Sequence, residues 1–214
     1  MPQQTFVPAI DGFIFAKDAT YNTAHDAASG TAATPYWNNP IASYFYNTNY
    51  SIFRTFLFFD TSLIPSGAAN TSAALHVYQQ AFFDDAGIDT GGNDVALVEA
   101  TPASDSALVD GDFDECGAVD NPTEGAPRVT FNNTGTTGWR TFTLSATGRG
   151  WINRTGITVL GLRADIDADD TAPTDGVKEV ALDISSMEYT NEAYLIVNYN
   201  LGKQPMPTFF RKTT

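Results

Sequence analysis

The chain has 214 residues, of which 43% are hydrophobic and 13% aromatic, and it carries a formal net charge of −14 at pH 7. This length and apolar content suit one domain with a full hydrophobic core. The strong negative charge argues against nucleic acid or an anionic membrane surface as a partner, because both are bound through basic patches.

The N-terminal residues show no targeting signal. They read Met-Pro-Gln-Gln-Thr-Phe and lack the basic region and the hydrophobic stretch of a signal peptide. No apolar run along the chain reaches the length of a membrane span, so we expect no membrane insertion. We therefore expect either a protein used inside the producing cell or one whose leader has been removed.

Short strand-like runs follow one another along the chain, separated by turns rich in Gly, Asn, Asp, Pro and Thr. The runs are residues 12–16, 43–46, 52–59, 73–78, 94–100, 128–131, 139–144, 158–163, 178–184 and 194–199. This pattern is typical of an all-β sandwich or barrel. Residues 145–153 favour a short helix, and the polar stretch 18–40 is expected to be a long loop.

The segment 54–78 predicts a strand, a turn and a second strand. Residues 56–59 read Phe-Leu-Phe-Phe, which indicates a strand buried on both faces, and the turn follows at Pro65. Arg54 and Asp60 are six residues apart. In an extended strand they lie on one face but about 20 Å from each other, which is too far for a direct pair. Each is therefore expected to anchor a neighbouring loop.

Aromatic and amide side chains gather between residues 36 and 50. The candidate residues are Tyr36, Trp37, Asn38, Tyr44 and Tyr46. Aromatic rings stack on sugars and amides hydrogen-bond to hydroxyl groups, so this group suits a neutral glycan. A protein interface uses the same side chains, and the rings can equally pack into the core. Trp139 and Trp151 lie in strand-like or motif positions and are expected in the core.

Two acidic segments alternate carboxylates with other side chains. The candidate ligands are Asp110, Asp112 and Asp114 in one segment and Asp165, Asp167 and Asp169 in the other. Hard oxygen ligands at alternate positions can wrap Ca²⁺, although neither segment has the Gly at the sixth position and the Glu at the twelfth that define an EF-hand loop. The alternative is a solvated acidic rim that keeps the protein in solution.

The sequence gives little support for catalysis. His25 and His76 occur in no His-x-His or Ser-centred motif of the kind that marks a metal site or a catalytic triad. Cys116 lies in an acidic loop that disfavours the thiolate, so we expect an inert thiol. Pairs of carboxylates can hydrolyse glycosides, but acids are so numerous here that any two can be paired on paper. We therefore expect a protein that is not an enzyme.

The last stretch, residues 201–214, differs in composition from the rest. It contains basic and aromatic side chains and two prolines but no acid, which suggests an arm leaving a domain that spans residues 1–200. Its candidate assembly residues are Phe209, Phe210, Arg211 and Lys212. A basic arm on an acidic protein is expected to dock either onto a neighbouring subunit or onto its own domain.

Two blocks of motifs carry a resemblance to a known family. The first reads Arg-Thr-Phe-Leu-Phe-Phe-Asp at 54–60, Leu-Ile-Pro at 63–65 and Ala-Ala-Leu-His-Val-Tyr at 73–78. The second reads Gly-Trp-Ile-Asn-Arg-Thr-Gly at 150–156, Leu-Gly-Leu-Arg at 160–163, Ser-Ser-Met-Glu at 185–188 and Ala-Tyr-Leu-Ile-Val-Asn-Tyr at 193–199. In this order the blocks resemble DNRLRE-type modules, relatives of a carbohydrate-binding module family found on exported polysaccharide-degrading proteins and on surface and phage proteins. The resemblance implies a jelly-roll-like sandwich without catalytic activity.

Together these observations lead us to expect an all-β, jelly-roll-like sandwich of antiparallel strands with a C-terminal arm. The expected function is that of a structural surface protein, a decoration or fibre-type subunit of a virion or other large assembly, with a glycan-adhesive role. Its partners would be neighbouring subunits and polysaccharide, its location a virion or extracellular surface, and Ca²⁺ is the one cofactor that the sequence suggests. The alternative is a carbohydrate-binding module of a secreted polysaccharide-acting or cell-surface protein.

Overall fold

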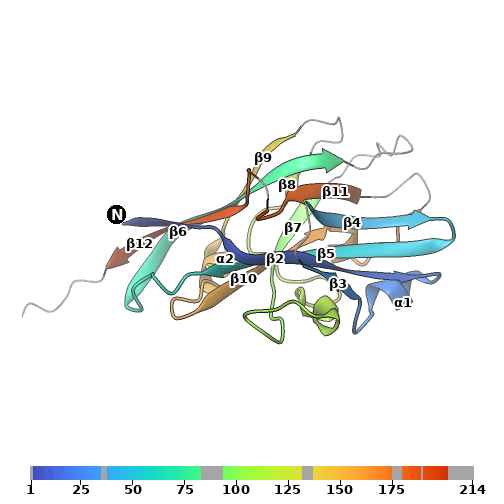
Figure 1. The fold of residues 1–214 in the computed structure, drawn as a ribbon, viewed down its shortest axis with the longest axis horizontal. Coiled ribbons are helices and arrows are strands. Elements are labelled where there is room, and N and C mark those ends of the chain that lie inside the picture. Colours follow the sequence, from blue (N-terminus) through green and yellow to red (C-terminus); the bar gives the residue numbers. More distant parts are fainter. Residues whose placement is uncertain are drawn as a thin grey trace, which may run out of the picture.

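The computed structural model describes residues 2–34, 38–82, 94–131, 137–174, 180–188 and 190–201, and these form mostly antiparallel β-sheet (Figure 1). The strands are β1 (Gln3–Phe6), β2 (Pro8–Asp18), β3 (Thr31–Ala33), β4 (Asn38–Tyr46), β5 (Asn49–Asp60), β6 (Ala68–Phe82), β7 (Asp94–Glu99), β8 (Val129–Thr130), β9 (Gly138–Thr143), β10 (Ile157–Ala164), β11 (Val180–Ser185) and β12 (Tyr194–Leu201). The helical elements are α1 (Tyr21–His25), the 3₁₀ helix η1 (Asp110–Glu115), α2 (Ala146–Gly150) and α3 (Asp165–Ala168). The predicted all-β fold class is confirmed.

The strand-like runs of the sequence all fall within or across observed strands, and the predicted helix coincides with α2. Ser145 caps α2, since its side-chain oxygen accepts a hydrogen bond from the Gly148 amide at 3.3 Å. The expectation of a long loop over 18–40 is wrong. This stretch contains α1, β3 and the start of β4, and α1 buries Tyr21 and His25.

The strands form one curled sheet in the order β1-β12-β6-β11-β4-β5-β10-β7-β8, with β2 paired to β5 and β3, and β9 paired to β6. The curl brings β6, β9 and β12 over β5, β7 and β10, so that the fold is sandwich-like. In Figure 1, β9 and β11 lie above the central strands β2 and β5, and the green segment that contains η1 lies below them. The finer jelly-roll topology stays a prediction.

Strand β5 is the centre of the fold because it is buried on both faces. Its side chains from Phe56 to Phe59 have no exposed surface, as the run of large residues predicts. Leu57 and Phe59 join the core between the two halves of the sheet, which also contains Leu75 of β6. Phe56 and Phe58 join a second core that is closed by Tyr21 of α1 and Phe113 of η1. Hence the sandwich carries an additional layer of helices and loops on one side.

A buried ionic network joins this outer layer to the sheet. The carboxylate of Asp167 in α3 accepts hydrogen bonds from Arg54 of β5 at 3.1 and 2.9 Å and from Arg163 of β10 at 2.7 and 3.0 Å. All three side chains have no exposed surface. Burial alone would raise the pKa of Asp167. The two guanidinium groups outweigh this effect and hold the pKa below its usual range. A buried carboxylate is thus matched by two cations, so the network depends on all three partners.

The remaining donors of the two arginines bind backbone carbonyls of the outer layer. Arg54 donates to the carbonyl oxygens of Phe113 and His25, each at 3.1 Å, and Arg163 donates to those of Ala118 at 2.7 Å and Val119 at 2.9 Å. The prediction that Arg54 anchors neighbouring loops is therefore confirmed. At the other end of β5, Asp60 accepts a hydrogen bond from the Ser62 amide at 3.1 Å and so holds the turn after the strand.

Cys116 lies within the second core and has no exposed surface. Burial raises the pKa of its thiol to about 12, which favours the protonated thiol at neutral pH. The expected inertness of this thiol stays a prediction. The space beside it depends on Gly161, where an added Cβ would lie 2.5 Å from the Cys116 sulfur.

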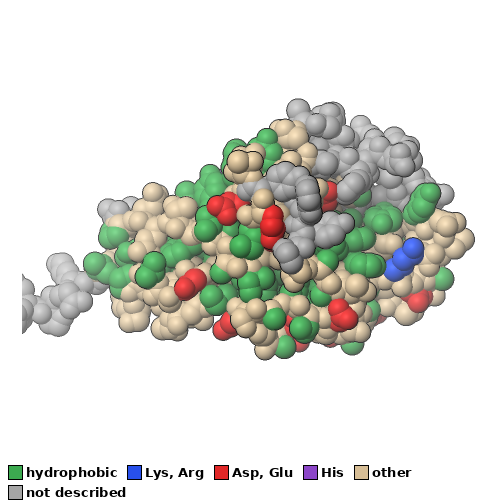
Figure 2. All heavy atoms as spheres, in the orientation of Figure 1, with side chains coloured by type: hydrophobic (Ala, Val, Ile, Leu, Met, Phe, Trp, Pro, Cys, Tyr) green, Lys and Arg blue, Asp and Glu red, His purple; other side chains and the backbone are tan. Residues whose placement is uncertain are grey.

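Among the described residues, no helix combines the length and the apolar character that crossing a membrane would need. The face shown in Figure 2 carries acidic side chains at several places along its length, with basic side chains confined to one place among the described residues. This distribution matches the net charge of −14.

Candidate binding surface

The outward faces of β6, β9 and β12 carry a continuous group of four rings and one threonine hydroxyl. This group, called the aromatic surface below, consists of His76, Tyr78, Trp139, Thr141 and Tyr194. The side chains face outward because neighbours in each strand point into the core: Leu75 and Val77 in β6, Phe142 in β9 and Leu195 in β12 are fully buried.

The strand register brings the members of the aromatic surface together. His76 lies opposite Thr141, and Tyr78 lies opposite Trp139, in the pairing of β6 with β9. Tyr194 lies opposite His76 in the pairing of β12 with β6. Residues directly opposite each other in antiparallel strands share a face and have closely spaced Cβ atoms. The group therefore comes from three segments that are distant in sequence.

The rings form a row across the sheet in which each ring contacts the next. The centroids of His76 and Tyr194 are 4.5 Å apart with the planes 16° from parallel. Trp139 meets Tyr194 edge-on at 5.1 Å and Tyr78 edge-on at 5.3 Å. These are favourable aromatic geometries. Trp139 nevertheless remains 42% exposed, so the rings support one another and leave a large ring open to solvent.

Hydrogen bonds fix the polar groups of this surface. His76 Nδ1 and the Thr141 hydroxyl are 2.9 Å apart, and the Tyr78 hydroxyl donates to that of Thr137 at 3.3 Å. Partial burial lowers the pKa of His76 from its ordinary value of 6.5, so the imidazole is neutral at pH 7. The aromatic surface therefore presents rings and hydroxyl groups but no formal charge of its own.

The same sheet face continues into a polar area toward β1. Asn198 of β12 lies opposite Ser72 of β6 and Gln3 of β1. The side-chain nitrogen of Asn198 donates to the Ser72 hydroxyl at 3.0 Å, and its side-chain oxygen Oδ1 accepts from the side-chain nitrogen of Gln3 at 3.2 Å. Asn198 is four positions after Tyr194, which corresponds to about 13 Å along the strand. Rings at one end and amides at the other together form an elongated, uncharged surface.

The aromatic residues expected from the sequence lie elsewhere. Tyr44 is half-buried and stacks on Phe53 with centroids 6.0 Å apart, while Tyr46 is 72% exposed near the end of β4. Asn38 donates its amide to the Asp183 carboxylate at 3.1 Å. Tyr36 and Trp37 lie outside the described residues. The described members therefore spread along β4 and do not form one ring cluster.

The two tryptophans expected in the core have different outcomes. Trp151 is half-buried and packs against the main core, as expected. The expectation for Trp139 is wrong, because its ring belongs to the aromatic surface. Phe142 and Arg140 occupy the opposite face of β9, where Arg140 lies 5.8 Å from the ring centre of Phe131. Because the charged Arg140 points inward, β9 does not alternate polar side chains outside with apolar side chains inside. That alternation would have predicted an exposed position for Trp139.

Five of the six carboxylates proposed as calcium ligands accept hydrogen bonds from, or form ion pairs with, other groups of the protein. Asp110 accepts from the Ala32 amide at 2.8 Å, and buried Asp112 accepts from the amides of Ala103 at 2.8 Å and Val109 at 2.9 Å. Asp114 is half-buried in η1. Burial raises the pKa of Asp165 to about 6, Asp167 pairs with the two buried arginines, and Asp169 pairs with Arg128. Calcium binding stays a prediction.

The described residues contain another group with the composition of a metal site. Ligand atoms of His25, Asp26 and Asp120 all lie within 4.8 Å of one another. Among the described residues, this group includes none of the six carboxylates predicted as calcium ligands. Sequence reasoning missed it because His25 and Asp26 lie at the end of α1 and Asp120 in a loop almost a hundred residues later, with no motif joining them.

Comparison with models of protein families and with curated proteins gives no relative from which a function can be transferred. A scan against models of protein families finds no match to the chain, and a search among curated proteins finds none either. The resemblance to DNRLRE-type modules thus rests on the sequence motifs alone.

Proposed function

We propose that this chain is a non-enzymatic surface-protein module that binds neutral polysaccharide through the aromatic surface. The observation that carries the proposal is the exposed Trp139, which Tyr78 of the adjacent strand β6 and Tyr194 of the more distant strand β12 both contact edge-on. A rigid, solvent-open ring is suited to stack on the apolar face of a sugar ring. Its hydroxyl and amide neighbours suit the sugar hydroxyl groups.

Charge supports a neutral glycan over other ligands. The chain has a net charge of −14, which repels nucleic acid and acidic polysaccharides. The aromatic surface itself adds no cation to offset this charge, since the pKa of His76 is lowered. The residues that define it also include no pair of carboxylates of the kind that hydrolyses glycosidic bonds. The chemistry of the surface therefore favours binding without turnover.

The setting of this binding module is proposed from the sequence. We place it on a virion or extracellular surface, as a decoration or fibre-type subunit with glycan-adhesive function, or as a carbohydrate-binding module attached to a larger protein. The arm residues Phe209, Phe210, Arg211 and Lys212, which would contact a neighbouring subunit, lie outside the described residues. The aromatic surface lies on a single outward face of the sheet. It can therefore bind polysaccharide both in an assembly subunit and in a module attached to a larger protein.

The proposal is tested by affinity electrophoresis and calorimetry with a panel of neutral polysaccharides. At least one should bind the wild-type chain, and Trp139→Ala should weaken that binding about fivefold or more, because the loss of one well-placed aromatic contact costs about 1 kcal/mol. Tyr46→Ala is the matched control, since it removes an exposed ring that lies outside the aromatic surface. Absence of any polysaccharide ligand, or equal losses for both variants, would contradict the proposal.

A further inference from the structure

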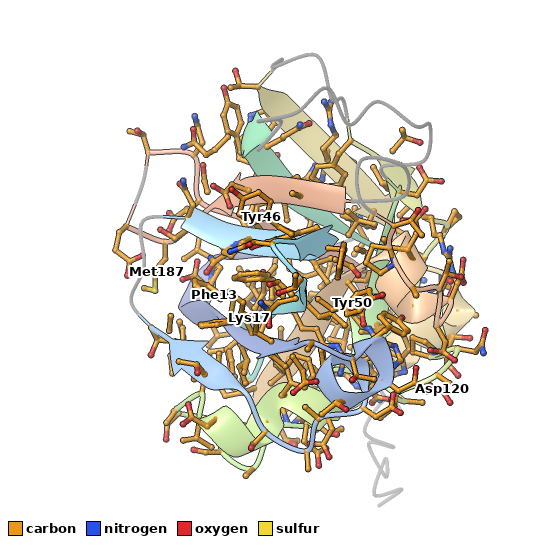
Figure 3. The ribbon with its side chains drawn as sticks, turned by 90° about the vertical axis from the view of Figure 1, so that its right-hand side faces the viewer. Phe13, Lys17, Tyr46, Tyr50, Asp120 and Met187 are labelled. Carbon is orange, nitrogen blue, oxygen red and sulfur yellow. The ribbon has the colours of Figure 1, made fainter. Side chains whose placement is uncertain are left out.

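His25 is a buried side chain that turns one ring nitrogen toward a group of surface carboxylates. Its side chain has no exposed surface, and its Nδ1 lies 2.6 Å from Asp26, 3.6 Å from Asp170 and 3.8 Å from Asp120. His25 ends α1, Asp26 follows it, Asp120 lies in the loop after η1, and Asp170 lies just after α3. Figure 3 shows Asp120 beside the helix α1. Three separate segments thus converge on one nitrogen.

The other ring nitrogen fixes the orientation of the imidazole. Nε2 lies 2.9 Å from the backbone carbonyl oxygen of Asp167, which can only accept a hydrogen bond, so Nε2 carries a hydrogen. The ring also stacks on Tyr21 with centroids 5.1 Å apart. An imidazole that donates one N–H to a backbone carbonyl and points its other nitrogen at a cluster of ligands has the arrangement of a metal-binding histidine.

The nitrogen Nδ1 lies at hydrogen-bonding distance from the Asp26 carboxylate, 2.6 Å from its Oδ1. A metal ligand must release the proton that such a contact holds, so a cation bound at Nδ1 takes the place of that proton. On the inner side of the ring, the guanidinium of Arg163 already lies 3.5 Å from Nε2. One cation placed between Nδ1 and the surrounding carboxylates can therefore bind all of them together.

The carboxylates are open to solvent and are otherwise free of cationic partners within the described chain. The side chains of Asp26, Asp120 and Asp170 are 52%, 61% and 45% exposed. Among the described residues, the ion pairs of all three are with His25 and with neither Lys nor Arg. Three like charges this close repel one another, and a divalent cation would relieve that repulsion.

We propose that His25, Asp26 and Asp120 bind a zinc-class divalent metal ion, with Asp170 available as a further oxygen ligand. Their ligand atoms lie within 4.8 Å of one another, a spacing that small ligand movements around one ion can satisfy. One imidazole nitrogen and two carboxylate oxygens form a ligand set that Zn²⁺ accepts, whereas Ca²⁺ prefers oxygen ligands alone. The bound ion joins α1 to the loops after η1 and α3, a cross-link that is independent of polysaccharide binding.

The test is calorimetric titration of Zn²⁺ into the untagged full chain after EDTA treatment and dialysis. We expect one saturable site per chain. Asp120→Asn and Asp26→Asn should each weaken Zn²⁺ binding by at least about tenfold, because each removes a charged ligand. Asp105→Asn is the matched control, since it removes an equally charged, exposed side chain outside the group and should leave binding unchanged.

The nitrogen that binds the ion can be identified by ¹⁵N NMR of the imidazole rings, which is practical because the chain has only two histidines. Zn²⁺ should shift Nδ1 of His25, leave its Nε2–H in place and leave His76 unchanged. The inference is overturned if no saturable Zn²⁺ binding is found, if only Ca²⁺ binds, or if Asp120→Asn binds Zn²⁺ as tightly as Asp105→Asn. It is equally overturned if Nδ1 keeps a proton at saturating Zn²⁺, since His25 is then simply an ion-paired imidazolium.

Discussion

Two regions of the molecule differ in which side chains they bury. The buried ionic network beneath α1 encloses charged side chains, whereas the aromatic surface on β6, β9 and β12 exposes apolar rings. In the network, Arg54, Arg163 and Asp167 have no contact with solvent and bind loops to the sheet. In the aromatic surface, Trp139 is a large apolar ring kept in contact with water. The difference indicates that the first region maintains the fold, whereas the second is available to a ligand. Mutations should therefore separate stability from binding.

The largest expected effect is the loss of stability in Asp167→Asn. This change keeps the shape of the side chain but leaves two buried guanidinium groups without a counter-charge, and the expected cost is about 3–5 kcal/mol. Urea unfolding followed by circular dichroism measures it, with Asp105→Asn as the control for a lost surface charge. Similar stabilities for the two variants would show that the network does not hold the outer layer.

A second buried carboxylate, Asp11, differs from Asp167 because no arginine pairs with it among the described residues. Its Oδ2 accepts the Met187 amide at 2.7 Å, its other oxygen has no hydrogen-bond partner within the described part of the chain, and burial raises its pKa to about 7. An unfolded aspartate has a pKa of about 3.9. Between these values the folded protein holds a proton that the unfolded chain has released, so the contribution of Asp11 to stability falls as the pH rises from about 4 to about 7.

Asp11→Asn should therefore stabilise the protein at pH 8 by about 1–3 kcal/mol, because a neutral amide avoids the cost of an unpaired buried charge. At pH 4 the advantage should largely disappear, since Asp11 is then protonated in the folded protein. Urea unfolding at the two pH values measures the effect. If the wild-type and variant proteins lose stability in parallel between pH 4 and pH 8, Asp11 is not the group responsible.

Mutations in the aromatic surface should show the reverse behaviour. Trp139→Ala and Tyr194→Ala should each reduce polysaccharide affinity while costing little stability compared with Asp167→Asn, because Trp139 is already 42% exposed. The double variant should lose less affinity than the sum of the single losses, with a coupling energy of about 0.5–1.5 kcal/mol for the ring pair. Strictly additive losses would indicate that the two rings act separately.

The smallest effect is expected at the exposed ion pair of Arg128 and Asp169. Their side chains are 25% and 48% exposed, so solvent screens the pair. Asp169→Asn should cost less than about 1 kcal/mol, and the difference should shrink in 1 M salt. Thermal unfolding at two salt concentrations tests this. A cost close to that of Asp167→Asn would remove the distinction between buried and exposed arginine pairs.

The sequence predicted the strands because their signal is local. The run Phe56–Phe59 shows burial on both faces from its composition alone, and β6 shows its two faces through the alternation of Leu75 and Val77 with His76 and Tyr78. Helix α1 was missed because five residues provide too short a period. Its burial depends on Phe56 and Phe58, which lie more than thirty residues further along the chain.

The aromatic surface could be predicted only in part. His76 and Tyr78 are recognisable as one face of a strand, but Tyr194 reaches His76 through a strand register between segments more than a hundred residues apart. For Trp139, hydrophobicity favoured the core, and the neighbouring Arg140 gave no indication that the tryptophan faces outward. Convergence of His25 with Asp120 likewise depends on how α1 and the loop after η1 are placed by the fold, which no local pattern encodes.

The position of β5 has a consequence for synthesis on the ribosome. Residues from Leu57 to Phe59 pair with β2, which is made earlier, but also with β10, where Thr158 lies opposite Phe59. At about 5–20 residues per second, β10 is completed at least about 5 s after β5. During this interval Phe56, Phe58 and Phe59 lack part of their final cover. The nascent chain should thus be most susceptible to aggregation and most dependent on chaperones before residue 164 has emerged.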